Sequence, residues 1–255
     1  MAFAVIFMVL TVGCSKKGKL VFDEYELQRN INNDSVRFEL SIVAEFPKPN
    51  CKGEVVDSIR LFLSRSLFSI EQIEEPNAML KRYADTVLAN YCADMRDFRR
   101  VAGFTDLFHQ EIVGVASVLS PELLSYDKST YLYYGGSQGQ RRFNSYVFSL
   151  VDGKCLLEED LYQEGKEEEL SKLLTEALKE LTHGEFQELV IPNNNFTVID
   201  EGVVYRYDGF ELNTFEIPAV ECIDLQIPSE KILPLLKEES VVYKYLNSQL
   251  NAEAK

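Results

Sequence analysis

The hydrophobic pattern of this 255-residue chain changes period several times, and these changes limit the folds open to it. Residues 36–46 alternate apolar and polar side chains with a period of two, which indicates a half-buried strand. Leucines recur three and four residues apart over 166–182, which indicates an amphipathic helix. The same criteria predict helices near 54–69 and from Pro76, strands at 108–119, 124–134, 142–151, 195–199, 203–207 and 219–227, and short helices near 229–236 and 239–248. Because strands and helices do not alternate regularly, the sequence predicts an α+β fold, with mixed or antiparallel sheets packed against amphipathic helices.

A seam near residues 100–110 separates a helix-rich first half of the sequence from a hairpin-rich second half. We therefore expect two sub-domains, an N-terminal α+β unit over 34–104 and a C-terminal α+β domain over 105–255. The three asparagines at 193–195 follow a proline and are interpreted as a plain polar loop.

The first thirteen residues carry no charge, are mostly apolar and run directly into Cys14. This run is too short to cross a bilayer as a helix, which needs about 20 apolar residues. It fits the core of an export signal. Residues 10–14 resemble a bacterial lipobox, although Thr11 stands where leucine is usual and no Lys or Arg precedes the run.

The lipobox resemblance implies that residues 1–13 are a lipoprotein signal peptide and that Cys14 is lipidated. Residues 14–33 are then expected to be a polar tether. The membrane, reached through lipidated Cys14, is the first expected partner. The tract after Cys14 is basic, and we expect a lipid-anchored protein of the cell envelope, on the periplasmic face of the outer membrane. A buried N-terminal strand is the alternative for the apolar run.

The composition excludes several classes of function. A formal net charge of -15 argues against nucleic acid as a partner, because phosphates need a basic surface. The two histidines, His109 and His183, form no zinc-binding motif with a neighbouring residue. The glycine-rich tract at 135–140 lacks the Lys-Ser/Thr ending of a phosphate-binding loop. We therefore expect no metal and no cofactor.

Four cysteines follow Cys14, and an even number is compatible with two disulfides in an oxidising compartment. Three pairings are possible, and we predict Cys51–Cys92 and Cys155–Cys222, each within one half of the chain. Four buried free thiols are the alternative. The wide spacing excludes a zinc-ribbon pattern.

Several segments of the second half occur in an order that resembles a known family. They are Tyr131–Ser137, Leu150–Lys154, Leu156–Tyr162, Asn195–Val198, Gly202–Tyr207 and Leu225–Pro228. The order is similar to an extracytoplasmic domain of unknown function. That domain occurs in the lysozyme-sensing anti-sigma factor of Gram-positive bacteria, beside some polysaccharide deacetylase domains, and in stand-alone lipoproteins of Bacteroides-like bacteria. The resemblance covers about residues 105–238 and implies a setting in the cell envelope.

One departure from this family limits what the resemblance implies. The family usually has Gly-Gly-Ala-His after the aromatic strand, whereas this chain has Gly135-Gly136-Ser137-Gln138. A function that depends on that histidine therefore does not carry over.

The aromatic strand and the loop after it are the surface that we expect to bind a ligand. Its candidate residues are Tyr131, Tyr133, Tyr134, Gln138, Arg141, Arg142 and Phe143. Tyr and Arg are favoured at recognition surfaces because each combines apolar area with directed hydrogen bonds. The alternative is that Tyr131 and Tyr133 fill the core.

A hydrolase acting on envelope glycans is the enzymatic alternative, because glycosidases use two facing carboxylates. Glu158, Glu159 and Asp160 supply acids in one short segment. Adjacent residues on a strand point to opposite faces, however, and chance pairing is expected in a chain with 41 acidic residues. The expected anchor, the absence of catalytic motifs and the family resemblance together favour a non-catalytic binding or sensing module. The resemblance implies a ligand such as a lysozyme-like protein or a cell-wall glycan. A purely structural envelope protein is the remaining alternative.

Overall fold

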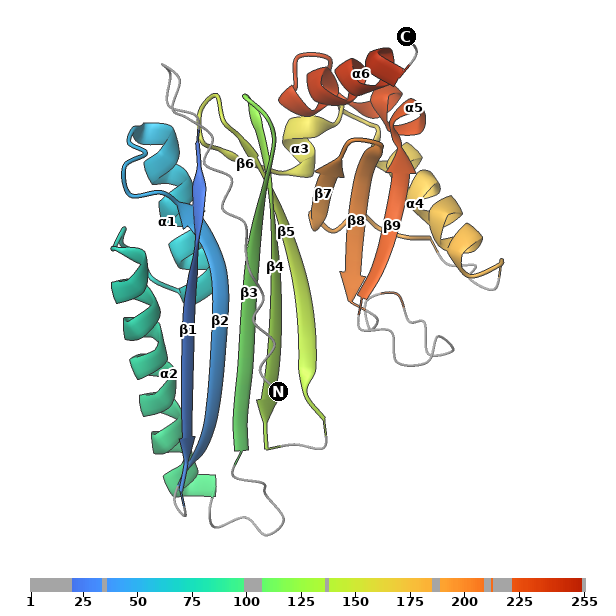
Figure 1. The fold of residues 1–255 in the computed structure, drawn as a ribbon. Coiled ribbons are helices and arrows are strands. Elements are labelled where there is room, and N and C mark those ends of the chain that lie inside the picture. Colours follow the sequence, from blue (N-terminus) through green and yellow to red (C-terminus); the bar gives the residue numbers. More distant parts are fainter. Residues whose placement is uncertain are drawn as a thin grey trace, which may run out of the picture.

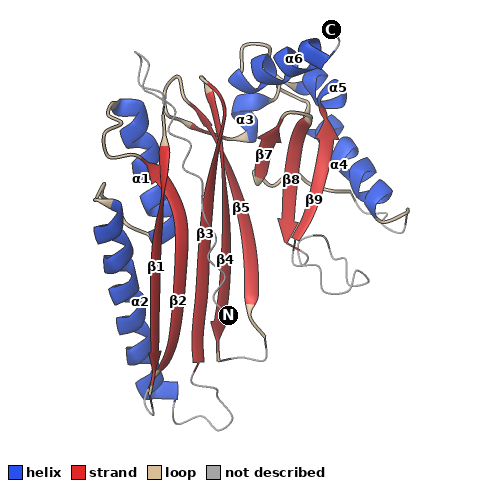
Figure 2. Cartoon of the chain, in the orientation of Figure 1, coloured by secondary structure: helices blue, strands red, loops and turns tan. Residues whose placement is uncertain are grey.

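The computed structural model describes residues 20–33, 36–98, 107–135, 138–184, 189–208, 212 and 222–253. In these residues the strands form two sheets, one of six strands in the order β1-β2-β3-β4-β5-β6 and one of three in the order β7-β8-β9 (Figure 1). Amphipathic helices pack against both sheets (Figure 2). The predicted α+β fold is confirmed.

The six-stranded sheet joins a hairpin to a meander. Its strands are β1 (Phe22–Asn32), β2 (Arg37–Pro47), β3 (Leu107–Ser120), β4 (Leu123–Tyr134), β5 (Gln140–Ser149) and β6 (Cys155–Leu156). The β2–β3 pair is parallel, and the other neighbours in this sheet are antiparallel. A parallel pair needs a long crossover connection, which α1 (Glu54–Phe68) and α2 (Pro76–Phe98) provide.

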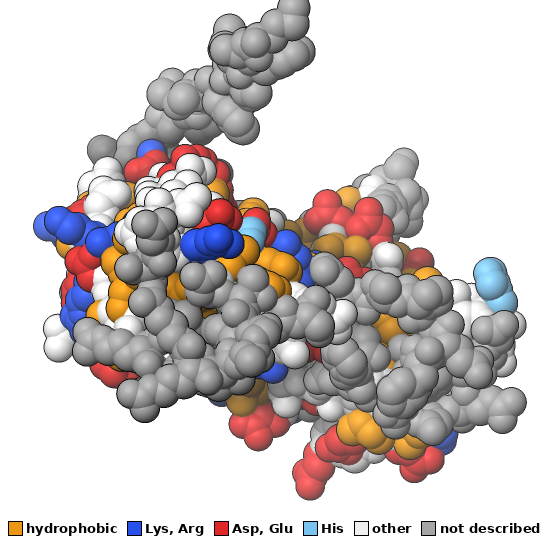
Figure 3. Space-filling view, turned by 90° about the horizontal axis from the view of Figure 1, so that it is seen from below, with side chains coloured by type: hydrophobic (Ala, Val, Ile, Leu, Met, Phe, Trp, Pro, Cys, Tyr) orange, Lys and Arg blue, Asp and Glu red, His pale blue; other side chains and the backbone are white. Residues whose placement is uncertain are grey.

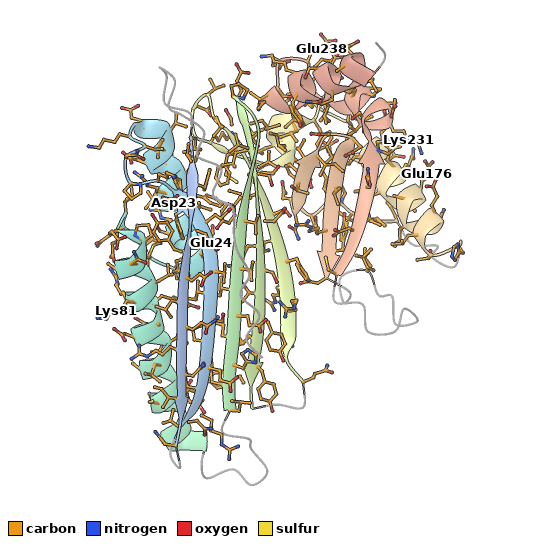
Figure 4. The ribbon with its side chains drawn as sticks, in the orientation of Figure 1. Asp23, Glu24, Lys81, Glu176, Lys231 and Glu238 are labelled. Carbon is orange, nitrogen blue, oxygen red and sulfur yellow. The ribbon has the colours of Figure 1, made fainter. Side chains whose placement is uncertain are left out.

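Helices α1 and α2 cover one face of this sheet. Even-numbered residues of β2 to β5, such as Phe38, Ile112 and Phe148, share a core with Ile59 and Leu63 of α1. The exposed Lys81 lies on the side of α2 that faces away from the sheet (Figure 4). We call the opposite face, to which the odd-numbered residues of β2 to β5 point, the open face.

The C-terminal unit has its own core around the second sheet. Its elements are α3 (Glu158–Leu161), α4 (Glu167–Leu181), β7 (Phe196–Ile199), β8 (Gly202–Asp208), β9 (Cys222–Pro228), α5 (Ser229–Ile232), the 3-10 turn η1 (Leu233–Leu235) and α6 (Val241–Glu253). The leucine stripe of α4, including Leu170, Leu174 and Leu178, is buried against this sheet. The predicted helix over 166–182 is confirmed.

The structure corrects two predicted boundaries. Residues 22–32 pair with residues 37–47, so most of the predicted tether over 14–33 is an edge strand. The apolar–polar alternation of this strand is interrupted in the sequence because the charged Arg29 occupies a position that faces the helices. There Arg29 forms an ion pair with Asp85 of α2. Strands β3 to β6 belong to the same sheet as β1 and β2, so the first unit extends to residue 156 and does not end at 104.

The predicted disulfides are wrong, because Cys51, Cys92, Cys155 and Cys222 are all free and half-buried. The Cys222 Sγ donates to Asp224 Oδ1 at 3.4 Å. Burial raises the pKa of the Cys155 thiol to about 11 and of the Cys222 thiol to about 12, so both stay protonated at neutral pH. Cys14 and the predicted signal peptide lie outside the described residues. Among the helices described, none is both long and apolar enough to cross a membrane.

Candidate binding cleft on the open face

The strand register places side chains from β3, β4 and β5 in rows across the open face. Glu111, Tyr131 and Arg141 form one row, and Val113, Ser129 and Phe143 form the next. His109 and Tyr133 stand opposite each other beyond the first row. Because paired residues share a face, residues up to 30 positions apart in the sequence, such as Glu111 and Arg141, become neighbours on this surface.

His109, Glu111, Tyr131 and Arg141 form a connected group that we call the Arg141 cluster. The Arg141 guanidinium donates to Glu111 Oε2 at 3.0 Å and to Ser129 Oγ at 3.1 Å. It also lies 5.1 Å from the centre of the Tyr131 ring, a cation–π distance. His109 Nε2 is 3.3 Å from Glu111 Oε1, and its ring meets Tyr131 edge to face. These contacts hold the guanidinium in one orientation at the surface.

A cleft of about 470 Å³ lies beside this cluster, where the C-terminal unit meets the open face. Val113, Val115 and Phe143 form the apolar part of the cleft. In the view from below, other hydrophobic side chains also reach the surface among charged ones (Figure 3). Val113 is 37% exposed and Val115 is 48% exposed. Exposed apolar side chains that lie next to each other on one strand and beside a cleft are typical of a contact surface.

Arg206 of β8 lines the cleft on the side of the C-terminal unit. Its Nη1 contacts Asp127 and donates to Ser145 Oγ at 2.8 Å, and its Nε lies 3.3 Å from Asp224 Oδ1. The Ser145 hydroxyl in turn donates to Asp127 Oδ1 at 2.7 Å. Only 18% of the Arg206 side chain is exposed. This ion-pair network joins β4 and β5 of the first sheet to β8 and β9 of the second.

Asn195, directly before β7, makes a further connection between the sheets. Its Oδ1 accepts from Ser145 N at 2.8 Å, and its Nδ2 donates to Phe143 O at 2.9 Å and to Arg206 O at 3.1 Å. The side chain thus occupies the place of a neighbouring strand at the edge of β5. The interpretation of 193–195 as a plain polar loop is therefore wrong for Asn195.

The structure divides the predicted ligand-binding residues between two faces. Tyr133 and Arg141 lie on the open face, and Gln138 is exposed in the loop between β4 and β5. Tyr134 lies on the helix-covered face, where its ring meets Phe108 edge to face and its hydroxyl donates to Asp94 of α2.

Arg142 lies opposite Thr130 and points to the same side of the sheet as Tyr134. The prediction of one shared surface is therefore wrong for Tyr134 and Arg142. Alternation along a strand separates neighbouring residues, and this principle alone divides the pairs 133–134 and 141–142.

Sequence reasoning missed most of the residues that shape the cleft. Asp127, Arg206 and Asp224 come from three strands and carry no local motif. Their association depends on how the two sheets pack. The exposed valines had a local signal, since Val113 and Val115 alternate with buried positions on β3, but that pattern alone does not identify the covered face.

The acids proposed for the hydrolase alternative make local structural contacts. Asn194 N donates to Glu158 Oε1 at 2.7 Å, and Glu158 N donates to Asn194 Oδ1 at 2.8 Å. Asp160 accepts from Leu157 N at 3.0 Å at the start of α3 and pairs with Lys154. Glu158 and Glu159 line a second cavity of about 490 Å³, whose lining does not include Asp160. The described residues contain no group of three or more His, Cys, Asp or Glu side chains arranged for a metal ion.

The pH dependence of stability tests this structural role of Glu158. Burial raises the pKa of its carboxyl group, against the opposing hydrogen bond from Asn194 N. The protonated acid is therefore favoured in the fold, and its stabilisation is complete below the unfolded pKa of about 4.3 and lost as the pH rises through the folded pKa. Glu158→Gln should raise the Tm at pH 7 and leave it unchanged near pH 4.

The exposed neighbour Glu159→Gln is the matched control and should leave the Tm unchanged at both pH values. A lower Tm for Glu158→Gln at pH 7 would show that the ionised carboxylate stabilises the fold.

Comparisons with known proteins show what this fold is similar to. No family model matches the chain. No curated protein matches it either. A solved DUF3298 family member from Bacteroides fragilis superimposes with a TM-score of 0.80 at 17% identity, over 90% of this chain and 98% of its own. A DUF3298 family protein from Pseudomonas aeruginosa gives a TM-score of 0.60 at 16% identity, over 86% and 94% of the two chains.

These neighbours support the expected likeness to a family of unknown-function domains. The links to anti-sigma factors and to lipoproteins stay predictions. At such low identity the similarity is one of architecture, and the chain has the fold of solved DUF3298 proteins.

Proposed function

We propose that this chain is a non-catalytic binding module of the cell envelope, anchored in the membrane through lipidated Cys14. Its ligand, a cell-wall glycan or a lysozyme-like protein, is held on the open face of the six-stranded sheet. The observation that carries the proposal is the cleft of about 470 Å³ between this face and the C-terminal unit.

The chemistry of the open face supports binding. The solvated face of a sheet usually carries polar side chains, whereas here Val113 and Val115 are exposed at the cleft. The Arg141 cluster adds fixed polar and aromatic groups at its border. Apolar surface next to a few oriented polar groups is the usual composition of a ligand site.

The anchor and the location rest on the sequence. The apolar run before Cys14 and the basic tract after it support export and attachment at the periplasmic face of the outer membrane. Labelling of growing cells with a radioactive fatty acid should mark the wild-type chain and leave Cys14→Ala unmarked. Label on neither chain would remove the anchor from the proposal.

The binding proposal predicts a loss of affinity when Arg141 is removed. The full chain, purified in detergent, should retain ligands from a panel of envelope glycans and muramidases. Arg141→Ala should weaken that retention at least tenfold, because truncating an Arg at a binding hot spot costs about 2 kcal/mol or more and about 1.4 kcal/mol corresponds to a factor of ten. Affinity is measured by surface plasmon resonance, and product release is followed in the same samples.

Arg65→Ala is the matched control, because Arg65 forms an exposed ion pair with Glu71 on the helix-covered side. It should bind as the wild type does. If the wild type binds no member of either the glycan panel or the muramidase panel, the proposal is contradicted and a structural role is favoured. Release of glycan products that Glu158→Gln abolishes would favour the hydrolase alternative.

A further inference from the structure

We infer that the cleft binds a short saccharide without acidic groups. The saccharide would lie between the Arg206 network and the apolar strip that Val113, Val115 and Phe143 form on the open face. This inference rests on the proposed function and narrows its ligand to one class. Three features of the cleft carry it, namely its apolar strip, its hydrogen-bonding groups and its charge.

The apolar strip matches the C–H faces of a sugar ring. Val113 and Phe143 lie in the same row on either side of Ser129, and Val115 follows Val113 on β3. All four residues line the cleft. The face of an aromatic ring is electron-rich and attracts the polarised C–H groups of a pyranose. A flat, ring-shaped ligand that is partly apolar fits this strip.

The inner wall supplies partners for hydroxyl groups. The two contacts of Asp224 with described residues, from Cys222 Sγ and Arg206 Nε, both use Oδ1. The Asp224 side chain is 52% exposed, so its second oxygen can accept from the ligand. Arg206 contacts Asp127 and Ser145 through Nη1 and Asp224 through Nε, and its guanidinium has five N–H donors. The Asp224 carboxylate can accept from one hydroxyl group of the ligand, and the Arg206 guanidinium beside it can donate to the neighbouring hydroxyl.

The charge of the cleft disfavours acidic sugars. Asp127 and Asp224 face one arginine there, and Lys128, whose backbone also borders the cleft, places its Nζ against Ser66 O of α1 on the helix-covered side. The charged side chains that face the cleft thus leave an excess of negative charge, and Arg141 at its border is already paired with Glu111. The chain as a whole carries a formal net charge of -15. A uronate or a phosphate-bearing glycan would place its negative charge close to the Asp224 carboxylate, and the two like charges would repel each other.

Titration of the full chain in detergent with two saccharides tests the inference. A neutral N-acetylglucosamine oligomer should bind, and an oligogalacturonate of the same length should bind at least tenfold more weakly. Asp224→Asn should weaken binding of the neutral oligomer at least tenfold. The matched control is Asp57→Asn. The Asp57 side chain is 53% exposed and pairs with Arg60 on α1, so this variant should leave the affinity unchanged.

Phe143→Leu is the second variant and should also lower the affinity for the neutral oligomer. The Tm of each variant shows that it is folded. Equal binding of the two saccharides, or wild-type affinity in Asp224→Asn, would overturn the inference. If the chain binds a muramidase but no saccharide, the saccharide inference is overturned and the proposed binding function stands. If it binds neither a muramidase nor a saccharide, both the inference and the proposed function are contradicted.

Discussion

Replacing Gly202 by alanine should strongly destabilise the C-terminal unit. Gly202 is the first residue of β8 and has a φ of +156°. A Cβ atom at this position would lie 2.1 Å from the backbone oxygen of Ile227 on β9, the neighbouring strand. A backbone oxygen cannot rotate away as a side chain does, so β8 and β9 must separate locally. We expect a loss of about 3 kcal/mol or more from the clash and the strained φ together. For a chain of this size, that lowers the Tm by about 6–12 °C.

Gly165→Ala separates the two causes of this loss. Gly165 has a φ of +79°, and a Cβ atom there would meet nothing within 4 Å. This variant therefore carries the backbone strain without the clash, and we expect it to lose about 1 kcal/mol. Thermal unfolding followed by circular dichroism measures both variants. Equal losses would show that the contact with Ile227 does not matter.

The second large effect is expected at Asn195, whose side chain joins the two sheets. Asn195→Ala leaves the backbone N–H of Ser145 and the backbone oxygen of Phe143 without this partner at the edge of β5. Each such group costs about 1–3 kcal/mol when it is left unpaired away from water. For these two groups we expect a total loss of about 2–6 kcal/mol. Urea unfolding should show the loss as a lower midpoint.

Two further variants define the cause. Asn195→Asp keeps the acceptor for Ser145 N and loses the donor to Phe143 O, so it should fall between the wild type and Asn195→Ala. Asn251→Ala removes an exposed asparagine that bonds within α6, and it should change stability by less than about 0.5 kcal/mol. An Asn195→Ala variant as stable as Asn251→Ala would show that water replaces the side chain at no cost.

The elements that the sequence predicted well are those whose pattern is local. The strand expected at 36–46 is β2, within one residue at each end, because its buried residues alternate without interruption. The strand β1 was missed because Arg29 breaks the apolar pattern, although its charge is paired with Asp85 on α2. Periodicity records the polarity of a residue and contains no information about a partner on a distant helix.

The cleft could not be predicted for a related reason. Arg206 and Asp127 are 79 residues apart, and the contact between them depends on the packing of one sheet against another. Residue type correctly indicated that Arg141 belongs to the open face. The alternation of side chains along a strand places the adjacent Arg142 on the opposite face. The row that joins Arg141 to Tyr131 and Glu111 also needs the register of three strands, which no single segment determines.

The position of β1 sets how far the proposed anchor lets the protein reach. Eight peptide units separate Cys14 from Phe22, so fully extended they span at most roughly 26–29 Å. The Arg141 row crosses the sheet at Gln28, six residues along β1 and about 20 Å further on. In a lipidated chain the Phe22 end of the sheet would therefore lie at most roughly 29 Å from the headgroups, and Arg141 at most about 20 Å further away. Its ligand would be met within about 50 Å of the bilayer surface, which limits capture to molecules that come that close to the membrane.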